Sequence, residues 1–169
     1  MPISDYLRDL RTRIGTTLVL MPSVAALIFD EHGRVLLARH SNGGVWSTPG
    51  GAIDPDEAPQ DAVAREVWEE LAVRVEPTRC LGSFGGPAFR ITYANGDVVS
   101  YVITAFECRR LDDAALRPDG DEVLEARYVG ADELRTLTLS SWAAVVLPTL
   151  MERRGDWVPP VTWRPPTGG

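Results

Sequence analysis

The sequence contains no lysine, because all 17 of its basic residues are arginine. Cysteine is nearly absent too, since only Cys80 and Cys108 occur and they form no C-x-x-C pair. This excludes a disulfide framework and a cysteine-ligated zinc site, and we interpret both thiols as reduced and structural rather than nucleophilic. Long apolar runs are also missing: the run at residues 24–29 is far too short to span a bilayer.

The charge balance is acidic, with a net charge of −7. Such a balance argues against binding of nucleic-acid polymers or anionic membranes, both of which need a basic surface. Acids and arginines precede the first apolar block, unlike in a secretion signal, so we expect a cytoplasmic protein. A length of 169 residues with 44% hydrophobic and 24% charged residues fits one globular domain.

One predicted helix, at residues 58–71, concentrates acidic side chains on one face. Glu66, Glu69 and Glu70 are spaced i, i+3 and i+4, which places them within a single turn. The buried stripe expected on the other side consists of Val63, Val67 and Leu71. Glutamates on a helix are often only a solvated surface, but three adjacent carboxylates also suit Mg²⁺ or Mn²⁺, which favour clustered oxygen ligands.

The spacing around these glutamates resembles the signature of the Nudix hydrolase family. That signature runs from a glycine through a glutamate and an Arg-Glu pair to a Glu-Glu pair and an aliphatic residue. The matching residues are Gly51, Glu57, Arg65, Glu66, Val67, Glu69, Glu70 and Val73. Residues 35–39 and 46–51 also resemble the strand and loop that lead into this motif in the family. The departure is Ala72, where the family usually has a glycine that ends the helix in a left-handed conformation.

The resemblance implies an α+β fold, an α/β/α sandwich with a mixed β-sheet between helices. It also implies a metal-dependent pyrophosphohydrolase that uses Mg²⁺ or Mn²⁺. Glu66, Glu69 and Glu70 would be metal ligands, and the main-chain carbonyl of Gly50 would join them. Glu57 would either be a further ligand or pair with Arg65, which orients the cluster.

The catalytic base has two candidates. Glu66 is the one consistent with the family, whereas Glu122 competes from the acidic loop at residues 119–122. An exposed loop acid is the simpler interpretation of Glu122.

Candidate substrate-binding residues are less well specified. Arg39 matches a position where the family often has a phosphate-contacting arginine, although a surface ion pair explains it equally well. Trp46, Phe84 and Tyr93 either stack on a base or pack in the core. Pro87 lies near the position of a proline found in family members that cleave ADP-ribose.

These residues favour a nucleoside diphosphate linked to another group, with ADP-ribose-like compounds or nucleotide sugars ahead of nucleoside triphosphates. The alternative from another functional class is a non-catalytic nucleotide-binding regulatory module. Such a module should lack some of the acidic metal-ligating residues, and here all are present. A diphosphate isomerase is disfavoured because neither cysteine lies in a supporting motif.

The order of elements divides the chain into an N-terminal amphipathic helical segment at residues 1–18, a Nudix domain at 19–155 and a proline-rich tail at 156–169. We expect a helix at 4–14, a hairpin from 24–29 and 34–39, and a strand at 79–84. A second hairpin joins 89–93 to 98–108 through Asn95-Gly96. A short strand at 126–129 and a helix at 140–154 follow. A homodimer through the first helix and Trp68 is a further prediction.

Overall fold

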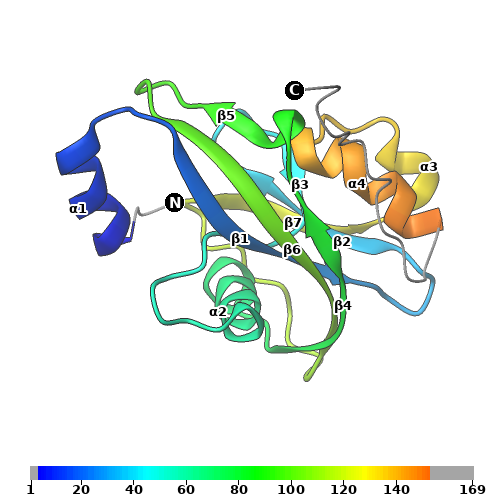
Figure 1. The fold of residues 1–169 in the computed structure, drawn as a ribbon. Helices are drawn as coiled ribbons and strands as arrows, with labels where there is room; N and C mark the ends of the chain where they lie inside the picture. Colours follow the sequence, from blue (N-terminus) through cyan, green and yellow to red (C-terminus); the bar gives the residue numbers. More distant parts are fainter. Residues whose placement is uncertain (1–3, 153–169) are drawn as a thin grey trace, which may run out of the picture.

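The computed structural model describes residues 4–152, which form two β-sheets with helices on both sides (Figure 1). The first sheet has the order β1 (Val19–Ile28), β6 (Val98–Arg110), β4 (Val75–Phe84), with β5 (Arg90–Thr92) also paired to β6. The second has the order β3 (Trp46–Ser47), β2 (Val35–His40), β7 (Val123–Val129). The helices are α1 (Asp5–Ile14), α2 (Pro59–Leu71), the short 3₁₀ turn η1 (Pro87–Phe89), α3 (Ala131–Leu134) and α4 (Ser141–Glu152).

Two hydrophobic cores lie on opposite sides of the sheets because β1 and β2 are covered on both faces. Val24, Ala26 and Ile28 pack with α2, whereas the alternate residues Ala25 and Leu27 pack with α4. A strand buried on both faces is apolar throughout rather than alternating. The pairing of β1 with β6 is parallel and the other pairings are antiparallel. The predicted α/β/α sandwich with mixed sheet is therefore confirmed.

The predicted hairpin at residues 24–39 is wrong. Its two strands belong to different sheets, and only one isolated bridge, between Phe29 and Val35, joins them. The turn between them is well formed, since Asp30 accepts hydrogen bonds from the backbone N–H groups of His32 and Arg34. A tight turn therefore connects strands that then diverge, because each finds a longer partner elsewhere.

Several other predicted elements are confirmed. The hairpin across Asn95-Gly96 joins β5 to β6, and α1 begins after Ser4, whose side chain accepts from the Leu7 N–H at 3.3 Å. The strands β4 and β7 begin earlier than predicted. The last two residues of the predicted helix at 140–154 and the proline-rich tail at 156–169 lie outside the described residues.

No helix within residues 4–152 combines the length and apolar character needed to cross a membrane. The N-terminal helix α1 stands beside the sheet rather than over it (Figure 1). Its link to the body includes Arg11, which donates to the carbonyl of Val98 at 3.1 Å and pairs with Asp97 at 3.5 Å.

Ala72 ends α2 in a left-handed conformation, with φ 53° and ψ 36°, and its N–H donates to the carbonyl of Trp68 at 2.8 Å. A side chain with a Cβ is strained by about 1 kcal/mol in this conformation. We predict that Ala72→Gly raises the free energy of unfolding by about 0.5–1 kcal/mol, because the larger entropy of unfolded glycine offsets part of the relief. Denaturant unfolding measures this.

The matched control is Ala64→Gly in the interior of the same helix. This substitution should lower the free energy of unfolding by about 1 kcal/mol. If both substitutions destabilise the protein equally, the left-handed cap at Ala72 is not strained as described.

Candidate active site

Helix α2 presents one face to the core and part of the other to a cavity. Val63, Val67 and Leu71 are fully buried, as the helical spacing predicts. Glu66 and Glu70 are buried as well, with exposed fractions of 6% and 3%. The side chain of Glu69 is 57% exposed, so it stands at the rim. Two carboxylates thus lie beneath the surface, and buried charges need compensation.

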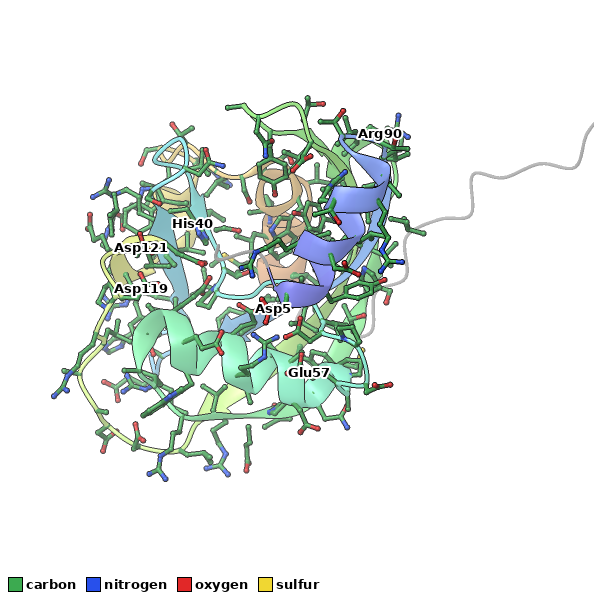
Figure 2. The ribbon with its side chains drawn as sticks, turned by 90° about the vertical axis from the view of Figure 1, so that its left-hand side faces the viewer. Asp5, His40, Glu57, Arg90, Asp119 and Asp121 are labelled. Atoms are coloured by element: carbon green, nitrogen blue, oxygen red, sulfur yellow. The ribbon has the colours of Figure 1, made fainter. Side chains whose placement is uncertain are left out.

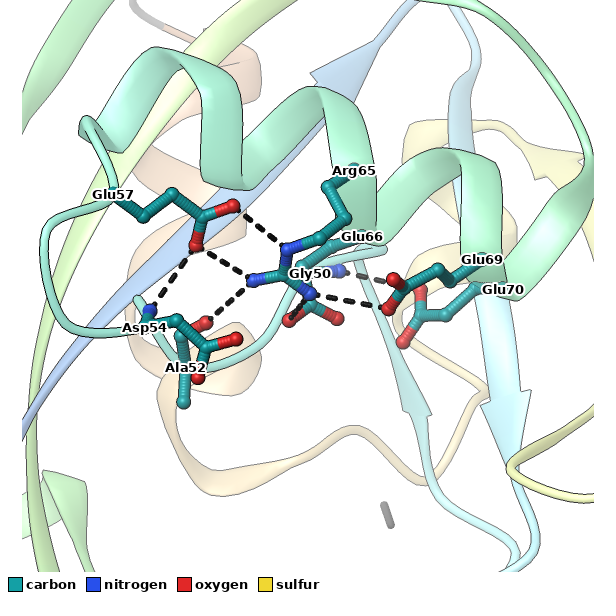
Figure 3. A network of polar contacts seen from close by, with 8 residues as sticks. All are labelled: Gly50, Ala52, Asp54, Glu57, Arg65, Glu66, Glu69 and Glu70. Carbon is teal, nitrogen blue, oxygen red and sulfur yellow. Dashed lines mark hydrogen bonds and ion pairs between the residues drawn. The ribbon is translucent and has the colours of Figure 1, made fainter. Parts of the chain in front are cut away.

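Arg65 supplies part of that compensation from the centre of a polar network (Figure 3). Its Nε and Nη2 donate to the two carboxylate oxygens of Glu57 at 2.7 and 2.8 Å. Its Nη1 donates to Glu66 Oε1 at 2.9 Å and to Glu69 Oε2 at 3.1 Å. The Ala52 carbonyl accepts from Nη2 at 3.1 Å. One planar guanidinium therefore orients three carboxylates and the preceding loop.

Glu57 pairs with Arg65 in the structure, and its role as a further metal ligand stays a prediction. Both of its oxygens accept from Arg65, and Oε2 also accepts from the Asp54 N–H at 3.1 Å. The hydrogen bonds from Arg65 hold the pKa of Glu57 below its usual range. This pairing fixes Arg65 beside the buried carboxylates.

The glycine pair ahead of α2 passes directly over the buried carboxylates. Gly50 has φ 145°, and a Cβ there would lie 2.2 Å from the Val24 carbonyl oxygen. A Cβ on Gly51 would lie 2.6 Å from the carboxylate of Glu66. Glycine is therefore required at Gly50, whereas a larger residue at Gly51 would displace the Glu66 carboxylate. The Gly50 N–H donates to Glu70 Oε2 at 3.2 Å (Figure 3).

The carbonyls on either side of Gly50 are bonded to β1. Pro49 O accepts from the Ala26 N–H at 2.8 Å and Gly51 O accepts from the Val24 N–H at 2.9 Å. Within residues 4–152 no such bond is found for the Gly50 carbonyl itself. This carbonyl is therefore available as an oxygen ligand next to Glu70.

Burial makes the two inner carboxylates poor acids. Burial raises the pKa of Glu66 to about 7, against the opposing influence of Arg65 and with added repulsion from Glu69 and Glu122. Burial also raises the pKa of Glu70 well above its usual value, and the charge of Glu66 adds to this. The Oε1 atom of Glu70 has no hydrogen-bond partner among the described residues. A buried carboxylate with an unpaired oxygen fits a cation ligand.

The loop at residues 111–122 brings a further carboxylate to this place. It is tied to the end of α2, because the N–H groups of Arg117 and Asp119 donate to the carbonyls of Leu71 and Glu70 at 2.9 and 3.1 Å. Figure 2 shows Asp119 at this end of α2 and Glu57 at the other. The charge of Glu122 reaches Glu66 and Glu70, since it contributes to the raised pKa of each.

Two cavities meet at the carboxylates, because Glu70 and Glu122 line both. The acid cavity has a volume of about 330 Å³. Its charged lining residues are Asp54, Arg65, Glu66, Glu69, Glu70, Asp119, Asp121 and Glu122. Its remaining wall is mostly apolar and includes Tyr6 and Leu7 of α1, Met21 and Ile53. Helix α1 therefore contributes to the site, which its sequence pattern did not predict.

The hydroxyl cavity has a volume of about 460 Å³ and shares Glu70 and Glu122 with the acid cavity. Most of its polar lining consists of hydroxyl groups. They belong to Ser23, Ser41, Ser47, Thr48, Tyr93, Tyr101, Ser140 and Ser141. The Tyr93 and Tyr101 hydroxyls lie 2.5 Å apart.

Of the predicted substrate-binding residues, Tyr93 alone lines one of these two cavities. Arg39 pairs with Glu125 at 3.2 Å, which is the surface alternative, and lines neither cavity. Trp46 and Phe84 are 7% and 4% exposed and belong to the core near α4. In the structure Arg39 is thus ion-paired and Trp46 and Phe84 are packed in the core, and their contact with a substrate stays a prediction. Pro87 begins η1, also away from both cavities.

Sequence reasoning missed Asp54 and the role of Asp119. The Asp119 side chain accepts from the N–H groups of Asp121, Glu122 and Val123 at 3.1, 3.1 and 2.8 Å, and so shapes the loop that carries Glu122. An aspartate before a glycine is typical of such a turn, and this signal was present at Asp119-Gly120.

Within residues 4–152 no three acidic, histidine or cysteine side chains are already gathered as a metal site. In the structure Arg65 donates hydrogen bonds to oxygens of Glu66 and Glu69. The donor set nevertheless suits a hard divalent cation, because it combines hard carboxylate oxygens, the unpaired Glu70 Oε1 and an available carbonyl at Gly50. Glu69 is exposed and therefore able to turn toward an ion.

The sequence model of the NUDIX domain matches residues 19–150. The chain belongs to the Nudix family. The resemblance predicted from residues 51–73 is thus confirmed. Helix α1, which lines the acid cavity, precedes the part of this Nudix protein that the family model matches.

Relatives of this Nudix protein carry different names. A MutT-like protein of Streptomyces ambofaciens is 45% identical over 62 residues, which cover 37% of this chain and only 40% of that protein. An isopentenyl-diphosphate Delta-isomerase of Mycolicibacterium vanbaalenii is 36% identical over 135 residues, covering 73% and 72%. The crystal structure of an ADP-ribose pyrophosphatase from Streptococcus suis has a TM-score of 0.60 at 29% identity, covering 78% of this chain and 90% of that one.

The raised pKa of Glu66 predicts how the metal-free Nudix protein responds to pH. The unfolded chain releases this proton near pH 4.5, whereas the folded protein releases it near pH 7. Unfolding therefore releases a proton between these values, and the free energy of unfolding falls as pH rises from about 5 to about 7. Thermal unfolding in a chelating buffer measures this, and Glu66→Gln should make the decrease smaller without abolishing it, because the raised pKa of Glu70 also contributes.

A divalent ion should reverse this loss of stability at higher pH, because it binds the ionised form of the carboxylates. Mg²⁺ at 100 times its Kd adds about 2.7 kcal/mol to the unfolding free energy at pH 7.5. The gain should be smaller at pH 5.5, where protons compete. A metal-free stability that increases from pH 5 to pH 7, or a gain from Mg²⁺ that is equal at both pH values, would contradict this description of the buried carboxylates.

Proposed function

We propose that this protein is a Nudix-type hydrolase that uses Mg²⁺ or Mn²⁺ to cleave a nucleoside diphosphate linked to another group. The observation that carries the proposal is the charge of the acid cavity, where seven carboxylates face a single guanidinium, that of Arg65. A diphosphate is itself anionic and would be repelled from such a cavity. Divalent cations between the carboxylates and the phosphates remove this repulsion.

The residues have separate roles in this proposal. Glu66, Glu69, Glu70 and the Gly50 carbonyl would hold the metal, which when bound would neutralise phosphate charge and acidify a coordinated water. Arg65 keeps Glu66 and Glu69 oriented through its hydrogen bonds. The paired Glu57 in turn fixes Arg65.

For the catalytic base we favour Glu122 over Glu66. Glu66 is buried and accepts a hydrogen bond from Arg65, which suits a fixed ligand. Glu122 is half-buried and lines both cavities at the point where they meet, so it has access to an attacking water. A carboxylate that accepts the proton of that water contributes about 10²–10⁴-fold to the rate.

The two cavities favour a substrate with a group on each side of the diphosphate. They meet at Glu70 and Glu122, so a diphosphate bound there directs one substituent into each. A third phosphate would gain little from the apolar wall of Tyr6, Leu7, Met21 and Ile53, whereas the face of a sugar ring can pack on it. We therefore place ADP-ribose-like compounds or nucleotide sugars ahead of nucleoside triphosphates. The name of the similar S. suis protein agrees with this.

Two other functions are less well supported. A regulatory module without chemistry would not need an intact set of acids at the family positions. An isomerase is the name of the M. vanbaalenii relative, but no thiol lines either cavity in the described part of this chain. Cys108 is buried in the core near α2, and burial raises its pKa to about 12.

A substrate panel tests the proposal: ADP-ribose, nucleotide sugars, CDP-alcohols, dinucleoside polyphosphates and nucleoside triphosphates with Mg²⁺ or Mn²⁺. We expect cleavage of a two-sided diphosphate, with product masses that show one water added at that linkage. If no compound is cleaved although nucleotides bind, the regulatory module becomes the better account.

Two variants separate the proposed roles. Glu69→Gln should greatly reduce turnover and shift the Mg²⁺ dependence to higher concentration while the fold is retained, because a negative ligand is lost. Glu122→Gln should lower kcat about 10²–10⁴-fold with an unchanged Mg²⁺ dependence. The control is Glu31→Gln in the turn before β2, which lines neither cavity. Full activity of Glu69→Gln would refute the metal site, and full activity of Glu122→Gln would leave Glu66 as the base.

A further inference from the structure

The start of α1 is the part of this helix that lines the acid cavity. Ser4, Tyr6 and Leu7 line it together with the glutamates of α2, whereas the later residues of α1 line neither cavity. Figure 2 shows Asp5, at the start of α1, close to α2. Tyr6 is 55% exposed, so its ring is accessible to a group that enters the cavity.

The other end of α1 is firmly anchored by Arg11. Its Nη1 donates to the carbonyls of Gly15 and Thr17 at 3.0 and 2.7 Å, and its Nη2 donates to the carbonyl of Val98 at 3.1 Å. Its Nε lies 3.5 Å from Asp97, and the side chains of this ion pair are only 11% and 16% exposed. Arg11 therefore fixes the end of α1 to the start of β6.

The start of α1 has no comparable attachment. Within residues 4–152, no hydrogen bond or ion pair joins residues 4–7 to the sheets or to α2, and those they make stay inside α1. None of the residues of α1 is buried. Leu7, Leu10 and Ile14 are half-buried at helical spacing, so a narrow apolar stripe supports the helix. A segment with few buried contacts opens at a low cost in free energy.

The turn after α1 has the properties of a hinge. Gly15 ends the helix with φ 59° and ψ −136°, a conformation that glycine adopts without strain. Residues 15–18 are exposed, and β1 begins at Val19. A helix of this length spans about 15 Å, so a rotation of about 20° at the turn moves its start by about 5 Å. A small change at Gly15 therefore opens or narrows the acid cavity.

The apolar wall of the acid cavity comes from two sides. Met21 and Ile53 belong to the body of the domain, whereas Tyr6 and Leu7 belong to α1. Met21 is 7% exposed and Tyr6 is 55% exposed, so the wall is more open on the side of α1. A ring between the two sides would cover the Tyr6 ring and favour closure by burial of apolar surface. The empty cavity offers no such gain, and a ligand shifts a conformational equilibrium only through such a difference.

We propose that α1 is a lid, hinged at Gly15 and anchored by Arg11, which closes on the group beyond the diphosphate and selects that group through Tyr6. This inference rests on the proposed function, because it takes the diphosphate to lie at the carboxylates. A ring-bearing group closes the lid, whereas a diphosphate without substituents leaves it open. The lid lies outside residues 19–150, which the family model matches.

The test follows the amide hydrogen exchange of residues 5–14 in the full chain by mass spectrometry. Three states are compared: Mg²⁺ alone, Mg²⁺ with methylenediphosphonate, and Mg²⁺ with α,β-methylene-ADP-ribose. In both ligands a CH₂ group replaces the bridging oxygen and prevents cleavage there, but only the second has substituents. The variants are Tyr6→Ala, Tyr6→Phe and Arg11→Ala. The control is Thr12→Ala, at an exposed position of the same helix that lines neither cavity.

We expect α,β-methylene-ADP-ribose to slow the exchange of α1 several-fold, and methylenediphosphonate to leave it as it is with Mg²⁺ alone. Tyr6→Ala should abolish the slowing and raise KM for the cleaved diphosphate about tenfold, with a smaller change in kcat. Tyr6→Phe keeps the ring and should behave as the wild type, as should Thr12→Ala. Arg11→Ala should speed the exchange of α1 without ligand and also raise KM, although Arg11 lines neither cavity.

Three results would overturn the lid: α,β-methylene-ADP-ribose does not slow the exchange of α1, methylenediphosphonate slows it equally, or Tyr6→Ala responds as the wild type does. Hydrolysis is scored separately on the substrate panel. If a two-sided diphosphate is cleaved and Tyr6→Ala leaves KM unchanged, the lid alone is refuted. If the analogue closes α1 through Tyr6 but no compound of the panel is cleaved, the lid stands and the proposed hydrolysis is refuted.

Discussion

The burial of two carboxylates under the surface is the constraint on which the rest of the site depends. Glu66 and Glu70 project from the same helix whose other face fills the core, so they cannot turn away to solvent without moving the packed stripe. Their negative charge must therefore be compensated at these buried positions. Arg65 compensates part of it through a hydrogen bond to Glu66, and the Gly50 N–H compensates another part through a hydrogen bond to Glu70. Glu70 Oε1 has no hydrogen-bond partner among the described residues, and it is there that the proposed cation would bind.

The groups that compensate this charge come from elements that are distant in the sequence. Strand β1 is buried on both faces and fixes the glycine turn through the carbonyls of Pro49 and Gly51. The end of α2 fixes the acidic loop, which brings Glu122 to the junction of the two cavities. The site is thus assembled by backbone hydrogen bonds. Its side chains complete a geometry that the main chain has already set.

Local sequence patterns predicted the secondary-structure elements, whereas tertiary contacts determine how these elements pair and pack. The helical spacing of Val63, Val67 and Leu71 and the turn at Asn95-Gly96 depend on neighbouring residues, so the sequence alone was sufficient for them. Whether β1 and β2 pair with each other depends on partners far along the chain, and there the prediction failed. For Arg39 and Trp46 the sequence left two alternatives open, and the tertiary structure shows an ion pair with Glu125 and core packing. The contribution of α1 to the acid cavity was not visible in the sequence.

Mn²⁺ binding, followed by electron paramagnetic resonance at pH 7.5, tests the central claim most directly, because free Mn²⁺ is observed without any assumption about the substrate. The wild-type protein should bind Mn²⁺, and Glu70→Gln should weaken that binding by at least about tenfold, since second-sphere changes alone already cost 10–100-fold at metal sites. A correctly folded Glu70→Gln variant that binds Mn²⁺ as tightly as the wild type would contradict the assignment of the buried carboxylates to a metal.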